Sequence, residues 1–149
     1  MRRLTRLAFS AVMISQLLAL SGCGGGVSED PLVIVSGTLH KEGQPLPMER
    51  ADVGLGSVQL TLTPVGEGGI SDYANAAEDG TFTFIGAGDG IAPGQYRFEI
   101  VHQKSGPGVD ELKGAFTADK SPIMIDVPVD KAGGEHELGI IELNEYGSK

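Results

Sequence analysis

Three histidines, His40, His102 and His136, are the side chains of this 149-residue chain with the widest catalytic and metal-binding chemistry. No two of them have the spacing of a zinc-binding pair. The chain also has no Gly-x-Ser-x-Gly motif for a serine nucleophile, and no glycine-rich loop followed by Lys-Ser or Lys-Thr. We therefore expect surface histidines, no catalytic residue, no metal site and no cofactor, in a protein that is not an enzyme.

Acidic residues lie in three segments with the composition of loops. They are Glu78 and Asp79 in AEDG, Asp89 in GAGDG, and Asp110 and Glu111 in GVDE. A calcium ion takes six to eight oxygen ligands, and the spacing of an EF-hand loop is absent. Asp-Gly pairs are typical of tight turns. We interpret these residues as turn formers, and calcium binding by the loops stays open.

The only cysteine, Cys23, follows Leu20-Ser21-Gly22. An aliphatic residue, two small residues and a cysteine resemble the lipobox of bacterial lipoproteins. The small residues let an extended chain enter the signal peptidase, and the thiol accepts a diacylglycerol. Cleavage before Cys23 then frees an amine for a further acyl chain. With no second cysteine an intrachain disulfide is excluded, so we predict Cys23 as the lipidation site and its acyl chains as the contact with the membrane.

The residues before Cys23 have the composition of a signal peptide. Arg2, Arg3 and Arg6 form a basic start, and residues 7–20 are mostly apolar. This apolar stretch is shorter than the roughly 20 residues that a spanning helix needs, as in a signal-peptide core. We therefore divide the chain into a cleaved lipoprotein signal helix, residues 1–22, a glycine-rich tether, residues 23–31, and a folded domain, residues 32–145.

The tether limits where the domain can lie. Nine residues lead from Cys23 to Leu32, and at about 3.3 Å per residue they reach at most roughly 30 Å. The domain is therefore expected close to a membrane surface. Gly24 stands where an Asp retains enteric lipoproteins in the inner membrane. We expect a membrane-anchored protein of the bacterial cell envelope, at the outer membrane, on its periplasmic or surface face.

The mature chain is strongly acidic. Loss of the three signal-peptide arginines from the 11 Lys+Arg leaves 8 against 20 Asp+Glu, a net charge of −12 for residues 23–149. Proteins that bind nucleic acid neutralise phosphates with basic groups, so nucleic acid is excluded as a partner. We interpret the acidity as a contribution to solubility.

Alternating apolar and polar residues indicate β-strands throughout the domain. The pattern lies within Leu32–His40, 57–64, 77–86, 92–102, 121–129 and 136–143, with Gly- and Pro-rich turns such as Asp79-Gly80 and Pro93-Gly94. Half-buried alternation favours antiparallel pairing over a parallel sheet. We predict an all-β fold, a single antiparallel β-sandwich of about seven strands. Its core is expected to contain Leu60, Phe82, Phe84, Tyr96, Phe98, Ile123 and Ile125.

Five motifs in order resemble the carboxypeptidase-regulatory-like domain, a transthyretin-like (prealbumin-like) β-sandwich common in small bacterial lipoproteins. They include Gly37-Thr38, Gly43 with Pro45-Leu46, Asp79-Gly80-Thr81-Phe82 and Pro93-Gly94-Gln95-Tyr96, and the match covers roughly residues 33 to 143. The chain departs from the family in the long segment Met48–Ser57 and in the glycine-rich Gly86–Gly90. The resemblance implies an accessory module without catalytic residues.

Two functions follow from these expectations. The first is a non-enzymatic, lipid-anchored envelope protein whose β-sandwich serves adhesion, scaffolding or the binding of an envelope protein or glycan. The alternative is a periplasmic or surface receptor for a small ligand, a cation or a glycan. The first needs an exposed apolar patch or a free sheet edge, and the second a concave site with convergent polar groups. We expect the contact surface in the loops at one end, including Met48–Ser57 and Gly86–Gly90.

Overall fold

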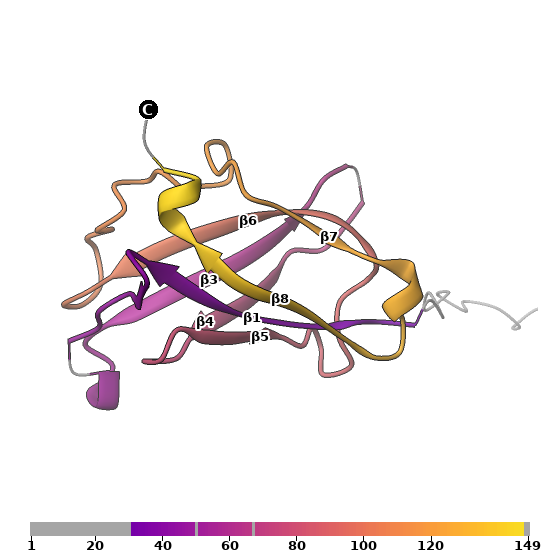
Figure 1. The fold of residues 1–149 in the computed structure, drawn as a ribbon, viewed down its shortest axis with the longest axis horizontal. Helices are drawn as coiled ribbons and strands as arrows, with labels where there is room; N and C mark the ends of the chain where they lie inside the picture. Colours follow the sequence, from indigo (N-terminus) through magenta and orange to yellow (C-terminus); the bar gives the residue numbers. More distant parts are fainter. Residues whose placement is uncertain (1–30, 50, 67, 148–149) are drawn as a thin grey trace, which may run out of the picture.

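Two β-sheets pack face to face in the computed structural model, which describes residues 31–49, 51–66 and 68–147 (Figure 1). In the first sheet, β1 (Ile34–Lys41) lies between β8 (Glu135–Glu142) on one side and β5 (Thr81–Phe84) and the short β2 (Gln44–Pro45) on the other. The second sheet has the order β4 (Asp72–Ala76), β3 (Ser57–Pro64), β6 (Gly94–Gln103), β7 (Met124–Val127). The predicted all-β sandwich is confirmed.

Short 3₁₀ helices lie between strands at η1 (Ala51–Val53) and η2 (Val129–Lys131), and η3 (Leu143–Glu145) follows β8. Within the described ranges, no helix has the length and apolar character needed to cross a bilayer.

The core lies between the sheets and follows the alternation of the strands. Every second side chain of a strand points to the same face, so Val58, Leu60 and Leu62 of β3 are buried. Three phenylalanine rings join the sheets at the centre. Phe98 of β6 lies with its ring centroid 5.5 Å from that of Phe82 and 6.1 Å from that of Phe84. The seven core residues expected from the sequence, Leu60, Phe82, Phe84, Tyr96, Phe98, Ile123 and Ile125, are all buried.

One strand pairing differs from the antiparallel pattern that we expected. β8 runs parallel to β1, because the chain leaves β7 in the second sheet, passes through η2 and returns to the first sheet beside the start of β1. The register of this pair shifts between Ser36 and Thr38. A Cβ on Gly37 would lie 2.8 Å from the ring of Phe82 and 3.2 Å from the Gly139 carbonyl oxygen, so the close approach of these strands requires glycine.

The strands give the sandwich two ends that carry different loops. At the entry end, where β1 begins, Leu32 accepts a 2.8 Å hydrogen bond from Gly133 N–H and Val33 pairs with Ile91. The loops 64–71, 85–93 and 128–134 gather there. At the far end, where β1 and β8 finish, lie the loop from β2 to β3, the loop 104–116 and η3 (Figure 1).

The two loops expected to form one contact surface lie at these opposite ends. Met48–Ser57 belongs to the far end, where Glu49 N–H donates a 2.8 Å hydrogen bond to the Lys104 carbonyl oxygen. Gly86–Gly90 belongs to the entry end, because β5 runs antiparallel to β1 and finishes beside Val35. The expectation of one shared surface is therefore wrong.

Candidate functional site

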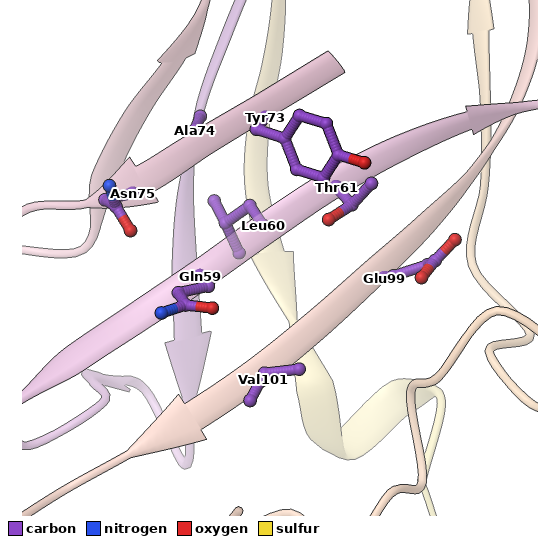
Figure 2. A pocket seen from close by; sticks show the side chains of 8 residues that line it. All are labelled: Gln59, Leu60, Thr61, Tyr73, Ala74, Asn75, Glu99 and Val101. Atoms are coloured by element: carbon purple, nitrogen blue, oxygen red, sulfur yellow. The ribbon is translucent and has the colours of Figure 1, made fainter. Parts of the chain in front are cut away.

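An open groove of about 320 Å³ lies on the outer face of the second sheet (Figure 2). It spans the three neighbouring strands β4, β3 and β6 and faces solvent, away from the core. The residues that line it are Gln59, Leu60, Thr61, Tyr73, Ala74, Asn75, Glu99 and Val101. Its volume is at the lower limit of the roughly 300–1,000 Å³ typical of small-molecule sites.

The strand register brings the lining side chains together in two rows. In the first row Thr61 of β3 is paired with Tyr73 of β4 on one side and with Glu99 of β6 on the other. In the second row Gln59 is paired in the same way with Asn75 and Val101. Side chains at directly opposite positions on one face have Cβ atoms about 4.5–5.5 Å apart, so each row is a continuous strip of side chains across the sheet.

Leu60 and Ala74 point to the opposite face of the sheet from the two rows. They pair with each other across β3 and β4, and Leu60 is fully buried in the core. Because their side chains point to the core, they line the groove through their backbone, while the side chains of the two rows form the surface that a ligand meets.

Tyr73 is the aromatic side chain among the described residues that line the groove. It is the second residue of the edge strand β4 and is 72% exposed. Figure 2 shows its ring beside Thr61, on the outer side of the sheet. An aromatic ring with this exposure offers an apolar face and a hydroxyl together.

Some of the polar groups around Tyr73 already make side-chain hydrogen bonds within the protein, and others do not. The Glu99 carboxylate accepts a hydrogen bond from the Thr63 hydroxyl, which holds it at the edge of the groove. In the described part of the chain, the amides of Gln59 and Asn75 and the Tyr73 hydroxyl make no side-chain hydrogen bond. The groove therefore offers two amides and a phenol that are free to bind a ligand.

Among the residues that the structure describes, no basic side chain lines this groove. Arg97 lies on the same face of β6, but its guanidinium donates a 2.5 Å hydrogen bond to the Ala118 carbonyl oxygen, in the loop before β7. The groove is therefore suited to a neutral, hydrogen-bonding ligand rather than to an anion.

One of the three histidines does not lie on the surface as expected. His102 is buried near the end of β6, and its Nε2 lies 2.8 Å from the Pro47 carbonyl oxygen. A carbonyl oxygen only accepts, so Nε2 carries the proton. His40 on β1 and His136 on β8 are half-buried. Among the described residues, no group of three His, Asp, Glu or Cys side chains is placed to hold a metal ion.

Two of the acidic loop residues organise their own loops. Asp110 accepts hydrogen bonds from the backbone N–H groups of His102 (3.0 Å), Leu112 (3.1 Å) and Gly114 (2.7 Å). Asp79 accepts from the hydroxyl and N–H of Thr81, and these hydrogen bonds lower the pKa of its carboxyl. Both carboxylates act as turn formers, as the sequence indicates.

Glu142 has a structural role that sequence reasoning missed. Its carboxylate accepts 2.9 Å hydrogen bonds from the N–H groups of both Glu42 and Gly43, the central residues of the β1–β2 turn. Both residues have positive φ, 58° and 72°, as the type I′ hairpin turn requires. Asn144 N–H donates to the same carboxylate at the start of η3. The Gly43 hydrogen bond is the largest cause of the lowered pKa of Glu142.

Cys23, the predicted lipidation site, lies outside the described residues, as do the signal segment and most of the tether. No protein-family model, no curated protein and no solved structure matches this chain.

Proposed function

We propose that this protein is a non-enzymatic, lipid-anchored protein of the bacterial envelope, whose β-sandwich is of the carboxypeptidase-regulatory-like, transthyretin-like type. In this proposal the sandwich is a binding module held near the membrane surface, and the groove over β4, β3 and β6 is its contact face. The observation that carries the binding role is the exposed Tyr73 ring on the edge strand β4, beside the amides of Gln59 and Asn75, which make no side-chain hydrogen bond among the described residues.

The anchor rests on the sequence around Cys23. Mass spectrometry of the membrane fraction is expected to find Cys23 as the first residue, carrying acyl chains. Cys23→Ser removes the thiol that accepts the diacylglycerol, so this variant should leave the membrane fraction. An unmodified thiol on a secreted wild-type chain would refute the anchor.

The chemistry of the exposed side chains supports this contact face. An exposed tyrosine on a sheet face offers an apolar ring and a hydroxyl together, which suits a contact that is apolar on one side and wet on the other. Aromatic residues are also enriched among the residues that contribute most to binding. The flanking amides each bring one acceptor and two donors, which fix the orientation of whatever covers the ring.

The binding role is tested by capture from the native envelope with the acylated protein as bait. Tyr73→Ala and Gln59→Ala should each reduce the captured partner, because they remove the ring and one amide from the groove. Tyr146→Ala is the matched control, since Tyr146 is also exposed but lies at the far end. Equal capture by all the variants and the wild type would place the contact elsewhere.

A glycan is the second candidate, favoured by the chemistry of the groove. Sugar rings present apolar C–H faces and rims of neutral hydroxyls, and the groove offers an aromatic face with amide and carboxylate partners. Titration calorimetry with neutral envelope oligosaccharides tests this directly. Heat of binding that disappears in Tyr73→Ala but persists in Tyr146→Ala supports a glycan receptor, and no heat with the wild type rules it out for the sugars used.

A further inference from the structure

The entry end of the sandwich exposes four aliphatic side chains. Ile70 is 89% exposed and Val129 is 76% exposed, and Val65 and Ile85 are each about half exposed. They come from three different loops, 64–71, 85–93 and 128–134. Single exposed aliphatic residues are common on protein surfaces, but here they share one end of the molecule.

Hydrogen bonds join each of these loops to a neighbouring part of the entry end. Val65 N–H donates to the Gln95 carbonyl oxygen (2.8 Å), and Gly86 N–H donates to the Asp72 carboxylate (2.9 Å). The third loop is joined to the chain entry, because Gly133 N–H donates to the Leu32 carbonyl oxygen (2.8 Å). The loops that carry the exposed residues are therefore neighbours in a fixed arrangement.

These three loops are also poorer in charge than those of the far end. By sequence they carry four charged residues, Glu67, Asp89, Asp130 and Lys131. The loops of the far end also expose aliphatic residues, Val53, Leu55 and Val109. By sequence they carry seven charged residues: Glu49, Arg50, Asp52, Lys104, Asp110, Glu111 and Lys113. Of the two ends, the entry end is the one with apolar side chains and few charges, as an interfacial contact with lipid requires.

The length of the tether decides what meets this end. Nine residues join Cys23 to Leu32, so the entry end lies within roughly 30 Å of an acylated Cys23 even when the tether is fully extended. Shorter, unextended tethers bring it closer. The tether therefore keeps these side chains close to the bilayer at all times, which favours the bilayer over any freely diffusing partner.

We infer that the entry end rests on the bilayer, with Val65, Ile70, Ile85 and Val129 at the boundary between headgroups and acyl chains. This inference rests on the proposed lipidation of Cys23 and adds a second, non-covalent contact to it. The net charge of −12 disfavours an anionic surface, so the contact is with a lipid surface of zwitterionic headgroups. The strands then stand away from the membrane, and the far end is the part most distant from it.

The test uses the full acylated chain in vesicles of zwitterionic phospholipid that carry a quencher in their acyl region. Acylation consumes the Cys23 thiol, so a new cysteine is the only free thiol and takes a fluorophore specifically. Labels are placed at Ile70→Cys and Val129→Cys in the entry end, and at Val53→Cys and Ile140→Cys as exposed controls elsewhere. We expect several-fold stronger quenching at the two entry-end positions than at either control.

Co-sedimentation of the same samples with the vesicles separates the two levels of the inference. Normal sedimentation with equal quenching at all four positions, or with stronger quenching at Val53→Cys, overturns the membrane-facing entry end and leaves the anchor in place. Absence of acyl chains and of sedimentation for the unlabelled wild type overturns both. A double variant, Ile70→Ser with Val129→Ser, should still sediment with the vesicles, because its acyl chains are unchanged. On vesicles its unaltered entry-end loop, 85–93, should exchange backbone hydrogen faster than the same loop of the wild type.

Discussion

Replacing Phe98 by alanine removes the ring that joins the two sheets at the centre of the core. Phe98 is fully buried on β6, and its ring contacts those of Phe82 and Phe84 from the opposite sheet, at centroid distances of 5.5 and 6.1 Å. The substitution therefore removes a large apolar side chain, two aromatic contacts and the material that fills the space between the sheets.

The expected cost follows from these three losses. Burying a phenylalanine contributes about 1.5–3 kcal/mol, and each aromatic pair adds about 0.5–1.5 kcal/mol. The cavity left behind brings typical Phe→Ala costs to about 3–5 kcal/mol. Since a domain has roughly 5–15 kcal/mol of stability, Phe98→Ala should lower the melting temperature by about 10–30 °C or prevent folding.

Thermal and urea unfolding, followed by circular dichroism, measure this cost. Tyr73→Ala is the control, because Tyr73 is an aromatic residue of the same sheet that points to the solvent face. It should change the free energy of unfolding by less than about 1 kcal/mol. If Phe98→Ala were as stable as Tyr73→Ala, the placement of Phe98 in the core would be wrong.

Three further predictions concern the loops. Gly90→Ala should lower the free energy of unfolding, measured in urea, by more than Gly88→Ala does. Both glycines have positive φ, so an alanine at either position costs on the order of 1–3 kcal/mol in backbone strain, but only at Gly90 would the added Cβ also lie 2.5–2.7 Å from backbone atoms of Val33. Glu142→Gln should make the free energy of unfolding fall less steeply at acidic pH than it does in the wild type. The pKa of Glu142 is lowered in the folded state, so its carboxylate stabilises the fold above the ordinary pKa near 4.5, and this stabilisation is lost as the pH falls through the lower pKa of the folded state. Asp110→Ala should cost about 1.5–3 kcal/mol and speed hydrogen exchange in residues 104–114, whereas unchanged exchange there would show that the carboxylate does not order the loop.

The alternation of apolar and polar residues predicted the central strands, because packing of one strand face against the other sheet causes both this alternation and the burial of the apolar residues. In β3, β5, β6 and β7 one face meets the other sheet, so apolar residues recur every second position and the core residues can be read from the pattern. The same alternation also predicts that His102 is buried. Tyr96, Phe98 and Ile100 point inward, and His102 is the next position of that series.

The features that the sequence did not predict depend on contacts between distant segments. β4 has the sequence DYANA, which lacks β-branched residues, and it forms a strand because its register with β3 places Ala74 and Ala76 toward the core. The groove depends on β4, since without it Tyr73 has no defined place beside Thr61. The parallel pairing of β8 likewise follows from the return of the chain through η2, which no local pattern encodes.

The strand geometry connects the groove with the membrane-facing entry end that we infer. Thr61 lies four residues before Val65, and at about 3.3 Å per residue this is roughly 13 Å along the strand. A bilayer in contact with Val65 and Ile70 would therefore place the groove on the side of the domain, within roughly 10–20 Å of the headgroups. A partner must then approach parallel to the membrane surface to cover Tyr73. This geometry favours a partner that is itself held close to the membrane, because two molecules confined to one surface meet at a higher effective concentration than either has with a freely diffusing ligand.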